Sequence, residues 1–170
     1  GVELLVENLR AESPDADSLS ALEELMIQPE FPGFDSHVQQ LVLSGLGDHY
    51  ESVQRWSDWV ITKEMLAERC EDLDERVVTM LSVADRQTQE DLPEVAVDTL
   101  RRLFLELPER EDVYAALESL CVEHGELELF GETLEEALEE QPNLDSAQRL
   151  LDRLLAVYEG DDEKRALSEA

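Results

Sequence analysis

The chain has 170 residues, 42% of them hydrophobic, a composition that is typical of a folded protein and that excludes disorder of the whole chain. Its 43 acidic residues outnumber 13 Lys and Arg, and the resulting formal net charge of -30 repels nucleic acid and anionic lipid surfaces. No apolar run reaches the roughly 18 residues needed to span a bilayer, so we expect no membrane insertion.

The acidity has two interpretations at this stage. An excess of acid combined with 11 Arg and only 2 Lys is typical of a solvated surface from a high-salt or GC-rich source. The alternative is a surface that meets a basic partner. Cys70 and Cys121 are too far apart for a metal-ligand spacing, and each is predicted to be a small core residue.

The first third of the chain predicts helices with irregular spacing. Ser13-Pro14-Asp15 and the stretch from Pro29 to Gly33 separate these helices, and Gly45 and Gly47 are expected to bend or split the third one. The predicted ranges are 2–11, 18–28, 35–53 and 55–70.

From residue 73 onward the helical periodicity is clearer. Pro93 lies in a first helical turn, where its missing N–H does no harm, and Gly125 is a C-terminal stop. Gly160 is expected to end a helix, with a last helix starting at Asp161 or Asp162. The predicted ranges are 73–89, 92–107, 110–124, 127–140 and 145–158.

These hairpins recur at a nearly constant step. Pro108 and Pro142 lie 34 positions apart, Leu92 lies 35 before Leu127, and Trp56 lies 36 before Leu92. Such a period is typical of a helical repeat array, in which each hairpin buries its apolar face against the next. The same register predicts that Trp56, Trp59, Leu92, Val95, Leu127 and Phe130 are inter-helix packing residues, in preference to an aromatic binding shelf at the two tryptophans.

The pattern resembles the tetratricopeptide family, in the degenerate form of long bacterial proteins, over about residues 35–160. The family's large and small positions fall on Tyr114, Leu117, Cys121, Leu134 and Ala137, and in the preceding repeat on Met80, Val83, Ala84, Ala96, Leu100 and Leu103. Departures occur at Glu118, Phe130 and Gln87. The resemblance implies an all-α fold, a right-handed α-solenoid of antiparallel helical hairpins. We expect one helical-repeat domain over 1–170, irregular over 1–34, and a fragment of a longer protein.

The resemblance also implies a function, a non-catalytic scaffold that binds a protein or peptide. The family's inward-facing positions fall on Asp85, Thr88, Gln89, Asp112, Ser119 and Glu123. These side chains are neutral or acidic, which disfavours acidic peptides and leaves a basic partner as an alternative. The acidic run Glu132, Glu135, Glu136, Glu139 and Glu140 makes the segment 108–142 the strongest cation-attracting surface.

Catalytic chemistry has little support in the sequence. His37, His49 and His124 lie in different predicted helices, and no phosphate loop, zinc motif or nucleophile elbow is present, so we expect no cofactor and no metal. The alternative function is a structural spacer or self-assembly segment. The first helix begins with apolar residues, Val2, Leu4, Leu5 and Val6, where a self-sufficient repeat array needs a polar cap. This apolar start favours the alternative function, because its side chains need another surface to pack against.

Overall fold

A computed structural model describes residues 1–11, 16–140 and 144–168, with side chains described over 1–11, 16–140 and 147–160. Within these ranges the secondary structure is entirely helical, with nine α-helices and one short 3-10 helix, and no strand. Each helix packs mainly against its neighbours in sequence. The all-α prediction is therefore confirmed, whereas the right-handed solenoid stays a prediction. The chain divides into two compact units, Gly1–Glu90 and Asp91–Ala170, which are described separately.

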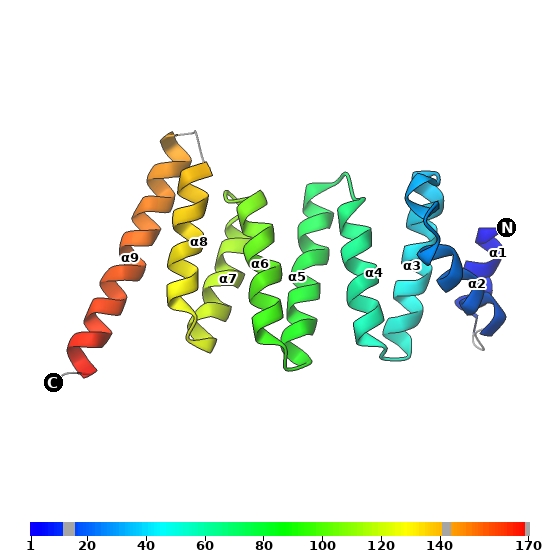
Figure 1. Cartoon of the computed structure of the whole chain (residues 1–170), viewed down its shortest axis with the longest axis horizontal. Helices are drawn as coiled ribbons and strands as arrows, with labels where there is room; N and C mark the ends of the chain where they lie inside the picture. Colours follow the sequence, from blue (N-terminus) through cyan, green and yellow to red (C-terminus); the bar gives the residue numbers. More distant parts are fainter. Residues whose placement is uncertain (12–15, 141–143, 169–170) are drawn as a thin grey trace. The chain divides into compact units, whose positions relative to one another are not determined.

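The first unit holds five α-helices and one 3-10 helix, and Figure 1 shows how they are arranged within the unit. α3, α4 and α5 follow one another in antiparallel directions, and α1 packs on both α2 and α3. Its core gathers buried side chains from all five helices and from the 3-10 helix. The elements are α1 (Val2–Leu9), α2 (Ala16–Ile27), η1 (Phe31–Gly33), α3 (Ser36–Ser52), α4 (Trp56–Glu68) and α5 (Leu73–Gln89).

Two glycines in α3 allow close helix packing. A Cβ on Gly45 would lie 2.8 Å from Val6 Cγ1 of α1, so only a glycine leaves room for the observed approach of the two helices. Gly47 faces α4, where an added Cβ would lie 3.5 Å from the nearest atom, Lys63 Cε. The expected split at these glycines is wrong, because α3 runs unbroken over 17 residues, whereas the expected bend stays a prediction.

The second unit is a run of four consecutive antiparallel helices (Figure 1). Its core contains an aromatic row in which the ring centroids of Phe104 and Tyr114 lie 6.1 Å apart and those of Tyr114 and Phe130 lie 5.6 Å apart. Leu117, Cys121, Leu134 and Ala137 are buried, as the repeat register predicted. The elements are α6 (Pro93–Glu106), α7 (Glu111–His124), α8 (Leu127–Glu140) and α9 (Leu144–Ser168).

Several helix ends follow from local chemistry. The Asp72 carboxylate accepts hydrogen bonds from the backbone N–H groups of Asp74 and Glu75, at 2.9 and 3.0 Å, and so caps α5. Gly125 adopts φ 76° after α7, and the next N–H, of Glu126, bonds to the Cys121 carbonyl at 2.8 Å. Both ends agree with the predicted boundaries.

Corrections are also needed at Gly160, at Leu92 and Val95, and at Cys70. α9 continues through Gly160, because one glycine inside a helix costs only about 1 kcal/mol. Leu92 and Val95 are 50% and 46% exposed, since Leu92 precedes α6 as its N-cap and Val95 lies at the edge of the buried stripe. Cys70 lies beyond the end of α4 and is only half-buried, so it is not a core residue.

Three arginines cap aromatic rings while pairing with a carboxylate. The guanidinium carbon lies 3.6 to 4.7 Å from the ring centroid in these three contacts, within the range of cation–π attraction. These ring-capping arginines are Arg55 over Tyr50 with Glu23 and Asp58, Arg86 over Trp56 with Glu90, and Arg153 over Tyr114 with Glu111.

Trp59 is buried and Trp56 half-buried, which confirms the packing interpretation of the tryptophans.

Candidate functional site

Three of the predicted partner-binding residues share one face of α5. Asp85 and Gln89 are exposed, and the Gln89 amide donates a hydrogen bond to the Asp85 carboxylate at 2.7 Å. Thr88 is half-buried, and its hydroxyl donates to the Ala84 carbonyl at 2.9 Å, so the hydroxyl is already engaged. Val78, seven positions before Asp85, is on the same face and is 64% exposed.

The other three predicted residues share one face of α7. Asp112, Ser119 and Glu123 are exposed, and their spacing of seven and four residues aligns them along the helix. Hydrogen bonding from Arg110, at 2.7 Å, holds the pKa of the Asp112 carboxyl below its usual value. Val122, three positions after Ser119, is 54% exposed.

The two sets lie in different units of the chain. Asp85, Thr88 and Gln89 belong to the first unit, and Asp112, Ser119 and Glu123 to the second. Within each set the side chains are on one helix face, as the register predicted. A common groove lined by all six residues stays a prediction.

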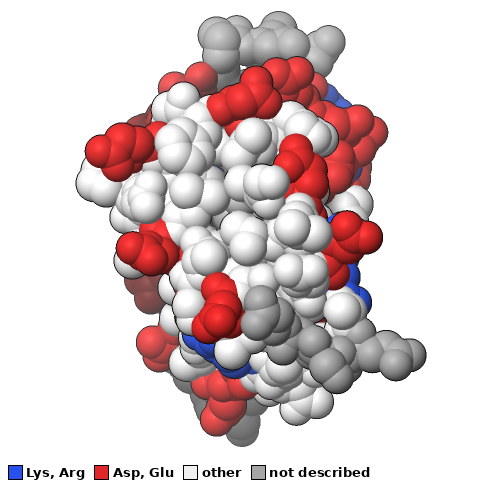
Figure 2. All heavy atoms as spheres, turned by 90° about the vertical axis from the view of Figure 1, so that its right-hand side faces the viewer, with Lys and Arg blue, Asp and Glu red and all other residues white. Residues whose placement is uncertain are grey.

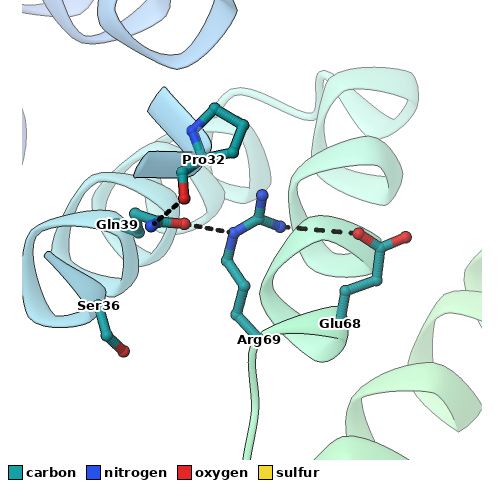
Figure 3. Close-up of a pocket in the computed structure, with 5 residues that line it drawn as sticks. All are labelled: Pro32, Ser36, Gln39, Glu68 and Arg69. Atoms are coloured by element: carbon teal, nitrogen blue, oxygen red, sulfur yellow. Dashed lines mark hydrogen bonds and ion pairs between the residues drawn. The ribbon is translucent and has the colours of Figure 1, made fainter. Parts of the chain in front are cut away.

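An open pocket of about 400 Å³ lies in the first unit, between the start of α3 and the end of α4 (Figure 3). Arg69 crosses it and donates from Nε to Gln39 Oε1 at 2.6 Å, and from Nη1 to the Met65 carbonyl at 2.6 Å. The Gln39 amide in turn donates to the carbonyls of Pro32 and Phe34, at 3.2 and 2.7 Å.

This network shows what the pocket can do chemically. The Arg69 guanidinium is tied to both helices, and Glu68 lies 3.7 Å from it and would oppose an incoming anion. The arrangement joins α3 to α4 through Gln39 and Arg69. The sequence did not predict this pocket, because neither Gln39 nor Arg69 belongs to a motif.

The acidic run on α8 is partly used in packing. Glu136 pairs with Arg101 of α6 at 2.5 Å, and the Tyr158 hydroxyl of α9 donates to Glu135 at 2.6 Å. Glu132, Glu139 and Glu140 are exposed. The segment therefore ties α8 to its neighbours through two carboxylates and leaves other acids at the surface.

The histidines and cysteines lie apart from one another. His37 and His124 are exposed on α3 and α7, while His49 is buried in α3. Burial raises the pKa of the Cys121 thiol to about 11, so this thiol stays protonated at neutral pH. In the described part of the chain, no cluster of His, Cys, Asp or Glu is arranged to hold a metal ion.

The apolar residues at the start of the chain differ in burial. Val6 is buried in the core, whereas Leu4 is 58% exposed on the opposite side of α1. Ile27, at the end of α2, is 75% exposed and was not predicted as a surface residue. The described helices include none that is long and apolar enough to cross a membrane.

Comparison of the chain with protein-family models, with curated proteins and with solved structures finds no match.

Proposed function

We propose that the chain is a non-catalytic scaffold that binds a protein or peptide through the exposed faces of α5 and α7. The observation that carries this proposal is an exposed valine on or beside each predicted polar face. Val78 lies on the face of Asp85 and Gln89, and Val122 lies beside Ser119 and Glu123. Protein interfaces combine apolar and polar side chains in this way.

Site-specific photo-crosslinking tests the proposal. A photoreactive amino acid is placed at Gln89 or at Ser119, and at the exposed Gln40 of α3 as the control position. Incubation with an extract of the source organism should yield a recurrent crosslinked protein at Gln89 or Ser119 and not at Gln40. Equal crosslinking at all three positions would contradict a specific binding face.

Substitutions give a second test once that crosslinked protein is purified. Val78→Ser and Val122→Ser should weaken binding, because each removes an exposed apolar side chain of its face while leaving the buried core intact. Val53→Ser is the matched control, because Val53 is a similarly exposed valine just after α3. Binding that is unchanged by both test substitutions would reject these faces.

A second candidate function is a structural spacer or self-assembly segment. The observation that favours it is exposed apolar surface on α9, where Leu151 and Leu155 lie four positions apart on one face. Sedimentation velocity over a range of protein concentrations separates the two functions. Reversible oligomers that dissociate in Leu151→Ser and Leu155→Ser would favour self-assembly, and a monomer at all concentrations would reject it.

A further inference from the structure

The first two helices carry more apolar surface than the core of their unit covers. α1 and α2 contain ten large apolar side chains, of which Val6, Leu9 and Leu22 are buried. The other seven form what we call the α1–α2 face. It consists of exposed Leu4 and Ile27, together with the outer parts of five half-buried side chains that also pack against the core: Val2, Leu5, Leu19, Leu25 and Met26.

The core beneath this face is already complete. α1 lies so close to α3 that a Cβ at Gly45 would meet Val6, and Leu22 and Val6 are almost fully enclosed. Further inward movement of α1 cannot cover Leu4 on its outer side. Figure 2, which looks onto the end of the chain where α1 and α2 lie, shows a broad area free of charged residues with acidic side chains at its margins.

The charged residues within α1 and α2 are all acidic. α1 and α2 contain five acidic residues and no Lys or Arg. Glu3, Glu7, Asp17 and Glu24 are exposed, while Glu23 pairs with Arg55 at 2.9 Å.

Nearby basic residues do little to offset these acids. Arg10 is the only Lys or Arg in residues 1–54, and its guanidinium pairs with Asp48 at 2.6 Å. An exposed apolar surface with an acidic margin therefore offers both contacts that an apolar, cationic ligand requires.

We propose that the α1–α2 face binds a helix-forming segment of a partner protein whose apolar stripe is flanked by Lys and Arg. This inference goes beyond the proposed scaffold function, because it adds a separate binding face and names the chemistry of the partner that the face binds. A second copy of the chain would bring the same acidic margin and be repelled. Nucleic acid and anionic lipid are disfavoured for the same reason.

Synthetic peptides test the proposal directly. Three peptides of about 14 residues, or four helical turns, are compared: an amphipathic Leu/Lys helix, an amphipathic Leu/Glu helix with the same apolar stripe, and a scrambled Leu/Lys peptide without a stripe. Affinities for the full chain are measured by fluorescence anisotropy at 0.15 M salt. We expect the Leu/Lys helix to bind about tenfold more tightly than either of the other peptides.

Variants locate the binding site. The double change Leu4→Ser with Ile27→Ser should weaken binding of the Leu/Lys helix about tenfold. The matched control, Val53→Ser with Ile61→Ser, removes similarly exposed apolar side chains elsewhere in the first unit and should leave this affinity unchanged. Circular dichroism checks that all variants retain helix.

Each remaining outcome overturns the proposal. Equal binding of the scrambled peptide would show general attraction to an acidic protein, and an unchanged affinity of the Leu4/Ile27 variant would place the site elsewhere. Concentration-dependent dimers that dissociate in that variant would assign the face to a second copy. Crosslinking at Gln89 and Ser119 reports independently on the α5 and α7 faces, so failure of this inference is distinguishable from failure of the scaffold function.

Discussion

Replacing Gly45 with alanine should destabilise the first unit, although alanine is the better helix former. A Cβ at position 45 would lie 2.8 and 3.1 Å from the two Cγ atoms of Val6, which is 2% exposed. Valine has a stiff side chain, so relief requires movement of α1. Overpacking of this kind costs about 1 to 3 kcal/mol, and the gain in helix propensity offsets about 1 kcal/mol.

Gly47→Ala is the matched control in the same helix. A Cβ there would meet Lys63 Cε at 3.5 Å and Thr62 Cγ2 at 3.8 Å, which are ordinary contacts. The gain in helix propensity then remains, and we expect stabilisation of up to about 1 kcal/mol. The two variants should differ by about 1 to 3 kcal/mol in the free energy of unfolding.

Urea denaturation followed by tryptophan fluorescence measures this difference. Both tryptophans, Trp56 and Trp59, lie on α4, so the signal reports on the first unit. Val6→Ala should cost less in the Gly45→Ala background than in the original chain, because it removes the clashing methyl groups. A Gly45→Ala chain as stable as the Gly47→Ala chain would refute the close-packing argument.

Three further predictions concern the core, pH and salt. Leu117→Ala should destabilise the second unit by roughly 2 to 5 kcal/mol, because Leu117 is 1% exposed, whereas exposed His124→Ala should cost much less; thermal unfolding followed by circular dichroism compares them. Burial, and then the charge of Arg55, lower the pKa of His49, so the folded chain binds its proton less readily than the unfolded chain. The contribution of His49 to the free energy of unfolding is therefore complete above the ordinary histidine pKa of about 6.5 and is lost as the pH falls below it. The decrease in stability at low pH should be smaller in His49→Gln. Added sodium chloride should raise the melting temperature, since the Debye length falls from about 10 Å at 0.1 M to about 3 Å at 1 M; a flat or falling melting temperature would reject self-repulsion at a charge of -30.

Sequence periodicity predicts a helix boundary correctly where a residue next to that boundary determines it. The ranges 73–89 and 127–140 agree with α5 and α8, because Asp72 caps one helix and Gly125 ends the helix before the other. Gly45 and Gly160 were misjudged for a different reason. Whether a glycine interrupts a helix depends on what packs beside it. The neighbour of Gly45 is Val6, which is distant in sequence, and a Cβ at Gly160 would meet no described residue within 4 Å.

The candidate binding faces were predictable only in part. Helical spacing correctly grouped Asp85 with Gln89 and Ser119 with Glu123 on exposed faces. Periodicity does not distinguish an apolar residue that is covered from one that is left open. Leu4 and Val6 are both apolar residues of the same predicted helix, so the sequence does not show which of them is buried. In the structure α1 packs on α3, and Val6 is buried while Leu4 is exposed.

The preference for arginine over lysine gains a physical basis from the ring-capping arginines. Each of the three places a planar guanidinium over an aromatic ring and also pairs with a carboxylate, which a compact lysine ammonium does less well. Because these arginines are engaged within the fold, they are not available to neutralise the rest of the acidic surface. Acidic side chains of α1 and α2 stay exposed at the surface. Because the ring-capping arginines already pair with carboxylates of the chain, a cationic partner would provide positive charge to complement the exposed acids.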